Sequence, residues 1–195
     1  RMELPAVVAS DPPAIVESPP ATPEPARVDL AAAARICGEL SRLQGGSGLA
    51  PVLARTARVL DASGLVIWLG AGEELFAATA HGYTPRMLAR LGPVPRSGTH
   101  PTPAAWRTAE MQTVPGCEGS NGAIVAPLSG ADGCFGVLAA EVRGGREHDN
   151  DTRAVTAIIA AQHAAIVAPW PAASYADVPS PGVEERQTPS KAASA

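Results

Sequence analysis

Two apolar runs on either side of a glycine-containing turn are the clearest pattern in the chain. Residues 123–128 are almost uninterrupted in their apolar character, and a second run over 134–142 follows an Asp132-Gly133 turn. Glycine accepts the positive φ that tight hairpin turns require, so the pattern predicts an antiparallel hairpin over residues 121–142. Because the first run shows no polar alternation, we expect that strand to be buried on both faces.

Helical periodicity lies on both sides of the central strands. Apolar residues recur at three- and four-residue steps over 28–43 and 49–60, and a third such segment follows Asp149 and ends at Pro169. Asp149 is well suited to cap the N-terminus of that last helix. The segments between are predicted to be two strands, a short helix, a proline-bearing loop, a helical turn and a further strand, over 65–69, 75–80, 83–91, 92–103, 104–109 and 111–114.

The order of these elements predicts an α+β fold. Strands flanked by helices at both ends are best accommodated by a central antiparallel β-sheet with the N- and C-terminal helices packed on one face. Residues 1–26 are rich in Pro and Ala and are predicted to form a disordered linker. Residues 169–195 have a similar composition and are predicted to form a disordered C-terminal tail, which leaves 27–168 as one domain.

Charge and composition argue against several classes of partner. The 195 residues are 46% hydrophobic and 17% charged, with a formal net charge of -4 and no concentrated basic stretch of the kind that binds nucleic acid. No apolar run approaches the roughly 20 residues that a bilayer span needs. The spacing of Cys37, Cys117 and Cys134 fits neither a disulfide framework nor a zinc site. We therefore expect a cytoplasmic protein, tethered to a membrane only if a segment upstream of Arg1 does so.

Two stretches carry a resemblance to a known family. Residues 53–69, which run LARTARVLDASGLVIWL, look like the opening helix and first strand of a GAF domain, and AIVAPL followed by GVLAAEV resembles its last two strands. The helix predicted over 152–168 stands where a GAF domain has its closing helix. The resemblance implies a sheet with helices on one side and a small-molecule pocket on the other. It also implies a bacterial sensory or regulatory role in signal transduction.

The resemblance places the ligand pocket along residues 81–118, the least regular part of the domain. Core packing is the competing interpretation, because aromatic side chains are common in the interior of such a fold. The ligand itself stays unidentified, and no cofactor or metal is assigned. The residues implied at the pocket are aromatic, basic or sulfur-bearing, namely Trp68, Phe76, His81, Tyr83, Trp106, Arg107 and Cys117.

Cys117 carries an enzymatic alternative. The sequence CEGSN before GAIVAPL is similar to the catalytic-cysteine neighbourhood of free methionine sulfoxide reductases, which are GAF enzymes. That chemistry needs a second cysteine to resolve a sulfenic acid. The loop over 96–103 would carry it and has none, and Ala139-Ala140 stand in place of an acidic pair, which leaves Glu141. We therefore expect a non-catalytic domain; a Cys117 reductase and a ligand-free scaffold are the alternatives.

Other GAF ligand classes lack their expected residues. The lysine-containing signature of the cyclic-nucleotide group is missing, and Cys117 with His81 or His100 is a poor match to a bilin attachment site. A haem held by His81, His100 or His163 has no evident second ligand.

The terminal helices suggest an interaction between chains. Both are rich in alanine, over 31–34 and 157–165, and small residues let helices approach closely. We expect the two helices to pair across a homodimer axis as a four-helix bundle, although the same alanines could pack on the domain's own sheet.

Overall fold

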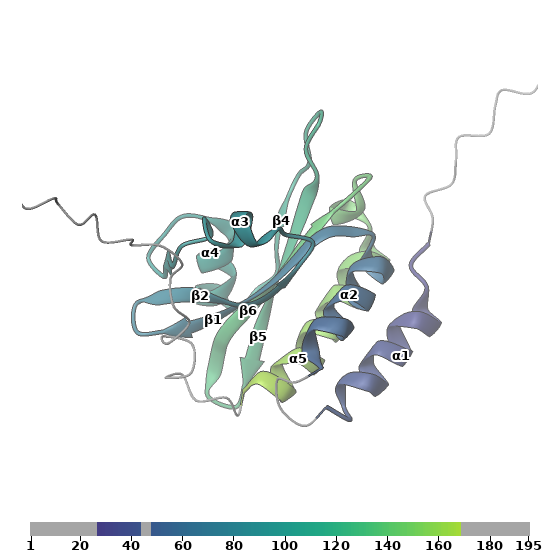
Figure 1. The fold of residues 1–195 in the computed structure, drawn as a ribbon, viewed down its shortest axis with the longest axis horizontal. Coiled ribbons are helices and arrows are strands. Elements are labelled where there is room, and N and C mark those ends of the chain that lie inside the picture. The colour runs from purple at the N-terminus through teal and green to yellow at the C-terminus, as the bar shows by residue number, and fades with distance from the viewer. Residues whose placement is uncertain (1–26, 44–47, 169–195) are drawn as a thin grey trace, which may run out of the picture.

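An antiparallel sheet with helices on both of its faces makes up the domain (Figure 1). The computed structural model describes residues 27–43 and 48–168. The strands are β1 (Ala62–Ala71), β2 (Glu74–His81), β3 (Val94–Pro95), β4 (Gln112–Val114), β5 (Gly122–Gly130) and β6 (Gly133–Val142). The helices are α1 (Leu30–Leu40), α2 (Leu49–Leu60), α3 (Pro85–Leu88), α4 (Pro101–Thr108) and α5 (Asn150–Val167), with a short 3-10 helix η1 (Arg146–His148) before α5.

The sheet order is β3-β2-β1-β6-β5-β4, and each neighbouring pair is antiparallel. The predicted α+β fold with a central antiparallel sheet is therefore confirmed. Helices α1, α2 and α5 lie side by side on one face, and α4 lies on the other (Figure 1). We call these two sides the three-helix side and the α4 side.

Alternate residues of the central strands serve two different cores. Leu65, Ile67 and Leu69 of β1 belong to the large core on the three-helix side, and all are nearly inaccessible to solvent. Val66 and Trp68 of the same strand face the α4 side. The smaller core on that side, called the α4 cluster below, consists of Val66, Trp68, Leu75, Ala105, Val125 and Val137.

The hairpin predicted over 121–142 is present as β5 and β6. Gly133 follows its tight turn with φ of +108°, a conformation that favours glycine. Ile124 and Ala126 of β5 face the large core, whereas Val125 faces the α4 cluster, which confirms a strand buried on both faces. Gly136 of β6 lets β1 approach closely, since a Cβ there would lie 2.4 Å from the carbonyl oxygen of Trp68.

The helix ends follow the capping chemistry in the sequence. Asp149 accepts a hydrogen bond from the Thr152 amide at 2.9 Å and another from the Thr152 hydroxyl at 2.6 Å. These bonds hold the pKa of Asp149 below its usual value. Asp29 caps α1 in the same way through the amide of Ala32.

Several element bounds differ from the prediction, and α1 is shorter than the predicted 28–43. Strand β1 is longer than 65–69, α3 is shorter than 83–91, and the expected loop over 92–103 contains β3 and the first turn of α4. Helix α4 begins early because Pro101 fits a first helical position and His100 accepts a bond from the amide of Thr102 at 3.4 Å. The linker and tail predicted for 1–26 and 169–195 lie outside the described residues. Within 27–43 and 48–168, no helix is long and apolar enough to span a bilayer.

His163 is a fully buried titratable side chain in α5. Its Nδ1 lies 2.8 Å from the carbonyl oxygen of Ile159, which can only accept, so Nδ1 carries the proton. Burial lowers the pKa of His163 below its ordinary value.

The buried imidazole predicts a stability that declines in mild acid. Because the pKa of His163 is lower in the folded chain, the unfolded chain binds a proton first as pH falls below about 6.5. The free energy of unfolding should then fall by at most about 1.4 kcal/mol per pH unit between pH 7 and 5. His163→Gln, measured by urea unfolding across this range, should flatten the decline. Equal slopes for the wild type and His163→Gln would contradict this assignment.

Candidate functional site

Three of the aromatic residues predicted at the pocket come together on the α4 side. Trp68 of β1 is buried in the α4 cluster. Trp106 of α4 and Tyr83, which precedes α3, both pack against the same cluster. These residues come from separate elements, and the sheet brings them onto one face.

A stacked pair of Arg96 and Trp106 is the most distinctive feature of this face. The Arg96 guanidinium carbon lies 4.1 Å from the centre of the Trp106 ring, within cation–π range. Arg107 donates hydrogen bonds to the carbonyl oxygens of Arg96 and Gly98, at 2.5 and 2.7 Å, and so fixes the segment that carries Arg96. Gly70 of β1 leaves room for the guanidinium, because a Cβ there would lie 2.1 Å from Arg96 Nη2.

Both members of this pair have a buried donor without an acceptor. Arg96 Nε and Trp106 Nε1 are inaccessible to solvent and have no hydrogen-bond partner within the described part of the chain. Buried donors in folded proteins are nearly always paired, because an unpaired one loses its hydration without compensation. The Arg96–Trp106 pair is therefore chemically suited to a ligand that brings a hydrogen-bond acceptor.

Tyr83 and Glu141 form a second polar contact on the α4 side. The Tyr83 hydroxyl donates to Glu141 Oε1 at 2.7 Å. Burial of the ring, and then this bond to a carboxylate, raise the pKa of Tyr83 well above its usual value. Tyr83 therefore stays a neutral donor. Its ring lies over Gly64, where a Cβ would lie 2.7 Å from the phenol.

Two other predicted pocket residues are on the opposite side of the sheet. Phe76 pairs with Leu69 across the β1–β2 ladder, and His81 pairs with Leu65. Directly paired residues of antiparallel strands point to the same face, and both leucines belong to the large core. Phe76 and His81 are thus separated from Trp68 and Trp106 by the sheet.

Cys117, the remaining predicted residue, is exposed in the loop between β4 and β5. The Ser120 amide donates to the Cys117 carbonyl at 2.8 Å and closes a tight turn. The thiols of Cys37 and Cys134 are partly buried, and burial raises the pKa of both, which makes their reactive thiolate forms scarcer. All three cysteines are free.

Glu147 of η1 anchors the loop that carries Cys117, a role that no sequence motif predicts. Its carboxylate is only 2% exposed and accepts a hydrogen bond from the Gly116 amide at 2.8 Å. A Cβ on Gly122 would lie 2.1 Å from the Glu147 Cδ, so glycine is needed at that position. A single Glu outside any motif does not indicate a site. The only related signal in the sequence is the group of glycines within 116–122.

The described residues form no metal centre on either face. Within 27–43 and 48–168, no group of three or more His, Cys, Asp or Glu side chains is arranged to hold a metal ion. The three histidines considered as haem ligands lie in different parts of the fold. His81 ends β2, His100 caps α4, and His163 of α5 is buried in the core.

Solved structures resemble this fold at low sequence identity. The GAF domain of a phosphoenolpyruvate-protein phosphotransferase from Coxiella burnetii has a TM-score of 0.61 and 14% identity, over 71% of this chain and 92% of that one. The nlh2 GAF domain from A. aeolicus in an inactive state has a TM-score of 0.59 and 14% identity, over 71% of this chain and 94% of that one. A free methionine-R-sulfoxide reductase from Neisseria meningitidis in complex with its substrate has a TM-score of 0.58 and 18% identity, over 74% of this chain and 89% of that one. No family model and no curated protein matches the sequence.

These neighbours show that the chain has the GAF fold, as the resemblance in its sequence implied. They also correct one prediction. The expectation of a non-catalytic domain is wrong, because free methionine-R-sulfoxide reductases share this fold. The fold accommodates sensory domains and enzymes alike, so it gives no reason to exclude activity.

The contact of Glu147 with Gly122 predicts a strong effect of one added methyl group. Gly122→Ala should lower the free energy of unfolding by about 2–4 kcal/mol, because the new Cβ displaces a buried carboxylate from the Gly116 amide. Gly92→Ala is the control, since a Cβ there meets nothing within 4 Å. Glu147→Ala in the Gly122→Ala background should recover part of the loss in chemical denaturation. Additive effects of the two substitutions would contradict the contact.

Proposed function

We propose that this chain is a sensory domain that binds a small ligand on the α4 side of its sheet. The observation that carries the proposal is the stacked pair of Arg96 and Trp106, whose Nε and Nε1 donors are buried without an acceptor. The GAF fold supports the same idea, because one neighbour is the GAF domain of a phosphotransferase and another was solved in an inactive state.

The surroundings of the pair suggest the kind of ligand. Trp68, Val137 and Ala105 form the buried apolar cluster against which Trp106 packs, and a guanidinium and an indole N–H provide the polar groups. Mostly apolar walls with a few placed donors are typical of small-molecule sites. The ligand is therefore a compact molecule with a carboxylate or carbonyl group and a small apolar body.

Homodimerisation through the terminal helices is part of this proposal. Leu30 of α1 and Ile158 of α5 are large apolar side chains that are 64% and 55% exposed. Helices α1 and α5 also contact each other within one chain, so a second copy would add to an existing helix pair.

The test is a thermal-unfolding screen of the full chain against amino acids and 2-keto acids. A ligand at 100 times its dissociation constant should stabilise the fold by about 2.7 kcal/mol, seen as a higher Tm. Trp106→Phe keeps an aromatic ring but removes the N–H, and it should abolish most of the shift, as should Arg96→Gln. Arg153→Gln removes an exposed arginine on α5 and should leave the shift unchanged. A shift of the same size in Trp106→Phe would contradict the proposed site.

A second candidate function is reduction of a methionine sulfoxide by Cys117. Two observations favour it: Cys117 is exposed in a loop fixed by Glu147, and a reductase with its substrate shares the fold. In this chemistry the Cys117 thiolate attacks the sulfoxide sulfur. The sulfoxide oxygen passes to the cysteine as a sulfenic acid, and methionine leaves. A dithiol then condenses with the sulfenic acid, releases water and restores the thiol through disulfide exchange.

The reductase activity predicts methionine formation from free methionine-R-sulfoxide with dithiothreitol as the reductant. Cys117→Ser should abolish the product, because it removes the nucleophile, whereas Cys134→Ser should retain it. Methionine is measured by chromatography against a sample without protein. Equal turnover by the wild type and Cys117→Ser would exclude Cys117 as the nucleophile.

A further inference from the structure

A cavity of about 410 Å³ lies on the three-helix side, where α1, α2 and η1 meet. Five arginines line it: Arg27, Arg35, Arg55, Arg58 and Arg146. Two acidic residues line it as well, Asp29 and Glu39. The arginines therefore exceed the acids by three formal charges, although the whole chain has a net charge of -4.

The acidic residues neutralise only part of this charge. Glu39 forms an ion pair with Arg55 at 2.5 Å, and Asp29 lies 4.0 Å from Arg35. The guanidinium of Arg58 has no hydrogen bond or ion pair with any residue of 27–43 and 48–168. Its positive charge is therefore available at the cavity wall.

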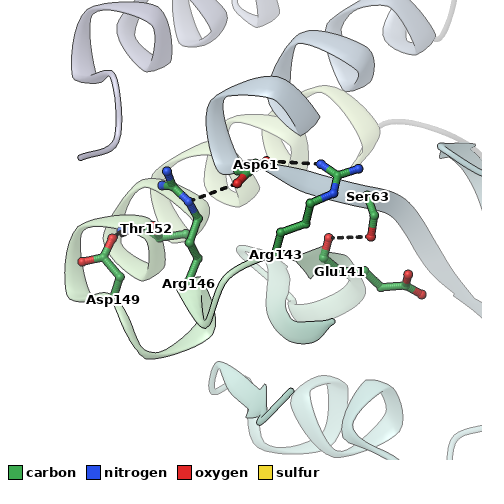
Figure 2. Close-up of polar contacts among 7 residues, drawn as sticks. All are labelled: Asp61, Ser63, Glu141, Arg143, Arg146, Asp149 and Thr152. Carbon is green, nitrogen blue, oxygen red and sulfur yellow. Dashed lines mark hydrogen bonds and ion pairs between the residues drawn. The ribbon is translucent and has the colours of Figure 1, made fainter. Parts of the chain in front are cut away.

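The side chain of Arg146 is fixed at the cavity by an ion pair with Asp61. Its Nε lies 3.5 Å from Asp61 Oδ2, while the other oxygen of Asp61 contacts Arg143 Nη1 at 3.2 Å (Figure 2). Asp61 ends α2 in a left-handed conformation, so the same residue fixes the end of α2 and the direction of Arg146. The Arg146 side chain is only 15% exposed. A guanidinium fixed by its neighbours loses little side-chain freedom when it binds an anion.

Two buried donors beside the cavity are also without an acceptor. Arg55 Nε and Arg146 Nη1 are inaccessible to solvent and have no hydrogen-bond partner in the described ranges. They come from α2 and η1, two of the elements that line the cavity. Unpaired guanidinium N–H groups of an arginine-rich cavity are suited to an anion with several acceptor oxygens.

We propose that this cavity binds a soluble small molecule with a diphosphate group. The arginine fork matches the geometry of phosphate oxygens, and the guanidinium of Arg58 adds a positive charge that no described residue pairs. The cavity is large enough for a group bigger than one phosphate. It lies across the sheet from the Arg96–Trp106 pair, so it is a second site that is independent of the function proposed above.

The test is isothermal titration calorimetry of the full chain with sodium pyrophosphate at low ionic strength, where screening of surface charge is weak. Arg58→Gln should weaken binding by about tenfold, because it removes one charged donor. Arg35→Gln should weaken it in the same direction. Both side chains are exposed, so the fold should persist, which circular dichroism checks. Arg90→Gln removes an exposed arginine after α3 and should leave affinity unchanged.

Adenosine diphosphate and vesicles with a phosphoinositide headgroup are the comparison probes. Binding of pyrophosphate or the nucleotide in solution, weakened about tenfold in Arg58→Gln and unchanged in Arg90→Gln, would support the proposal. Absence of binding to either soluble probe would overturn it, as would binding to vesicles alone. Equal weakening by Arg58→Gln and Arg90→Gln would also overturn it, since it would show attraction to overall charge rather than to this cavity.

Discussion

The burial of β1, β5 and β6 on both faces is the constraint on which the structure depends. A strand covered on only one face can alternate apolar and polar residues, but these strands place apolar side chains on both sides. The chain must therefore supply two layers of cover. Helices α1, α2 and α5 supply one, and α4 with its preceding segment supplies the other. Gly136 permits the tight approach of β6 to β1 at the centre of this arrangement.

The two layers give the two sides different chemistry. The α4 side combines a buried apolar cluster with the stacked Arg96 and Trp106, and the three-helix side carries an arginine-rich cavity. The sheet separates them, so ligands at the two sites would not touch. Strand β1 is a direct physical connection between the sides, because Trp68 belongs to one core and the adjacent Leu69 to the other.

The sequence predicted the long elements well, because their hydrophobic periods are strong. Helix α2 has the predicted bounds of 49–60, and the central hairpin lies where the turn residues indicated. Short elements such as β3 were missed, since a two-residue strand leaves no periodic pattern. Glu147 and Arg96 were missed for a different reason. Their roles depend on Gly122 and Gly70, which are distant in sequence and close only in the folded chain.

The placement of Phe76 shows how register limits such predictions. The β1–β2 ladder has an irregularity between Ile67 and Trp68, where β2 holds one extra residue. Without it, Phe76 would pair with Gly70 and lie on the α4 side; with it, Phe76 pairs with Leu69 and faces the other way. Catalytic activity cannot be predicted from the fold either, because the same fold hosts sensors and enzymes and only the chemistry of the site distinguishes them.

The stacking of Arg96 on Trp106 has a consequence for selectivity. One face of the indole ring is already covered by the Arg96 guanidinium, and the absence of a side chain at Gly70 leaves room for that guanidinium. A flat aromatic molecule that stacked on this face would first have to displace Arg96 and give up its cation–π contact. A small molecule that brings an acceptor to the unpaired N–H groups would leave the stack intact. At the proposed site, the arginine would therefore compete with planar rings for this face of the indole.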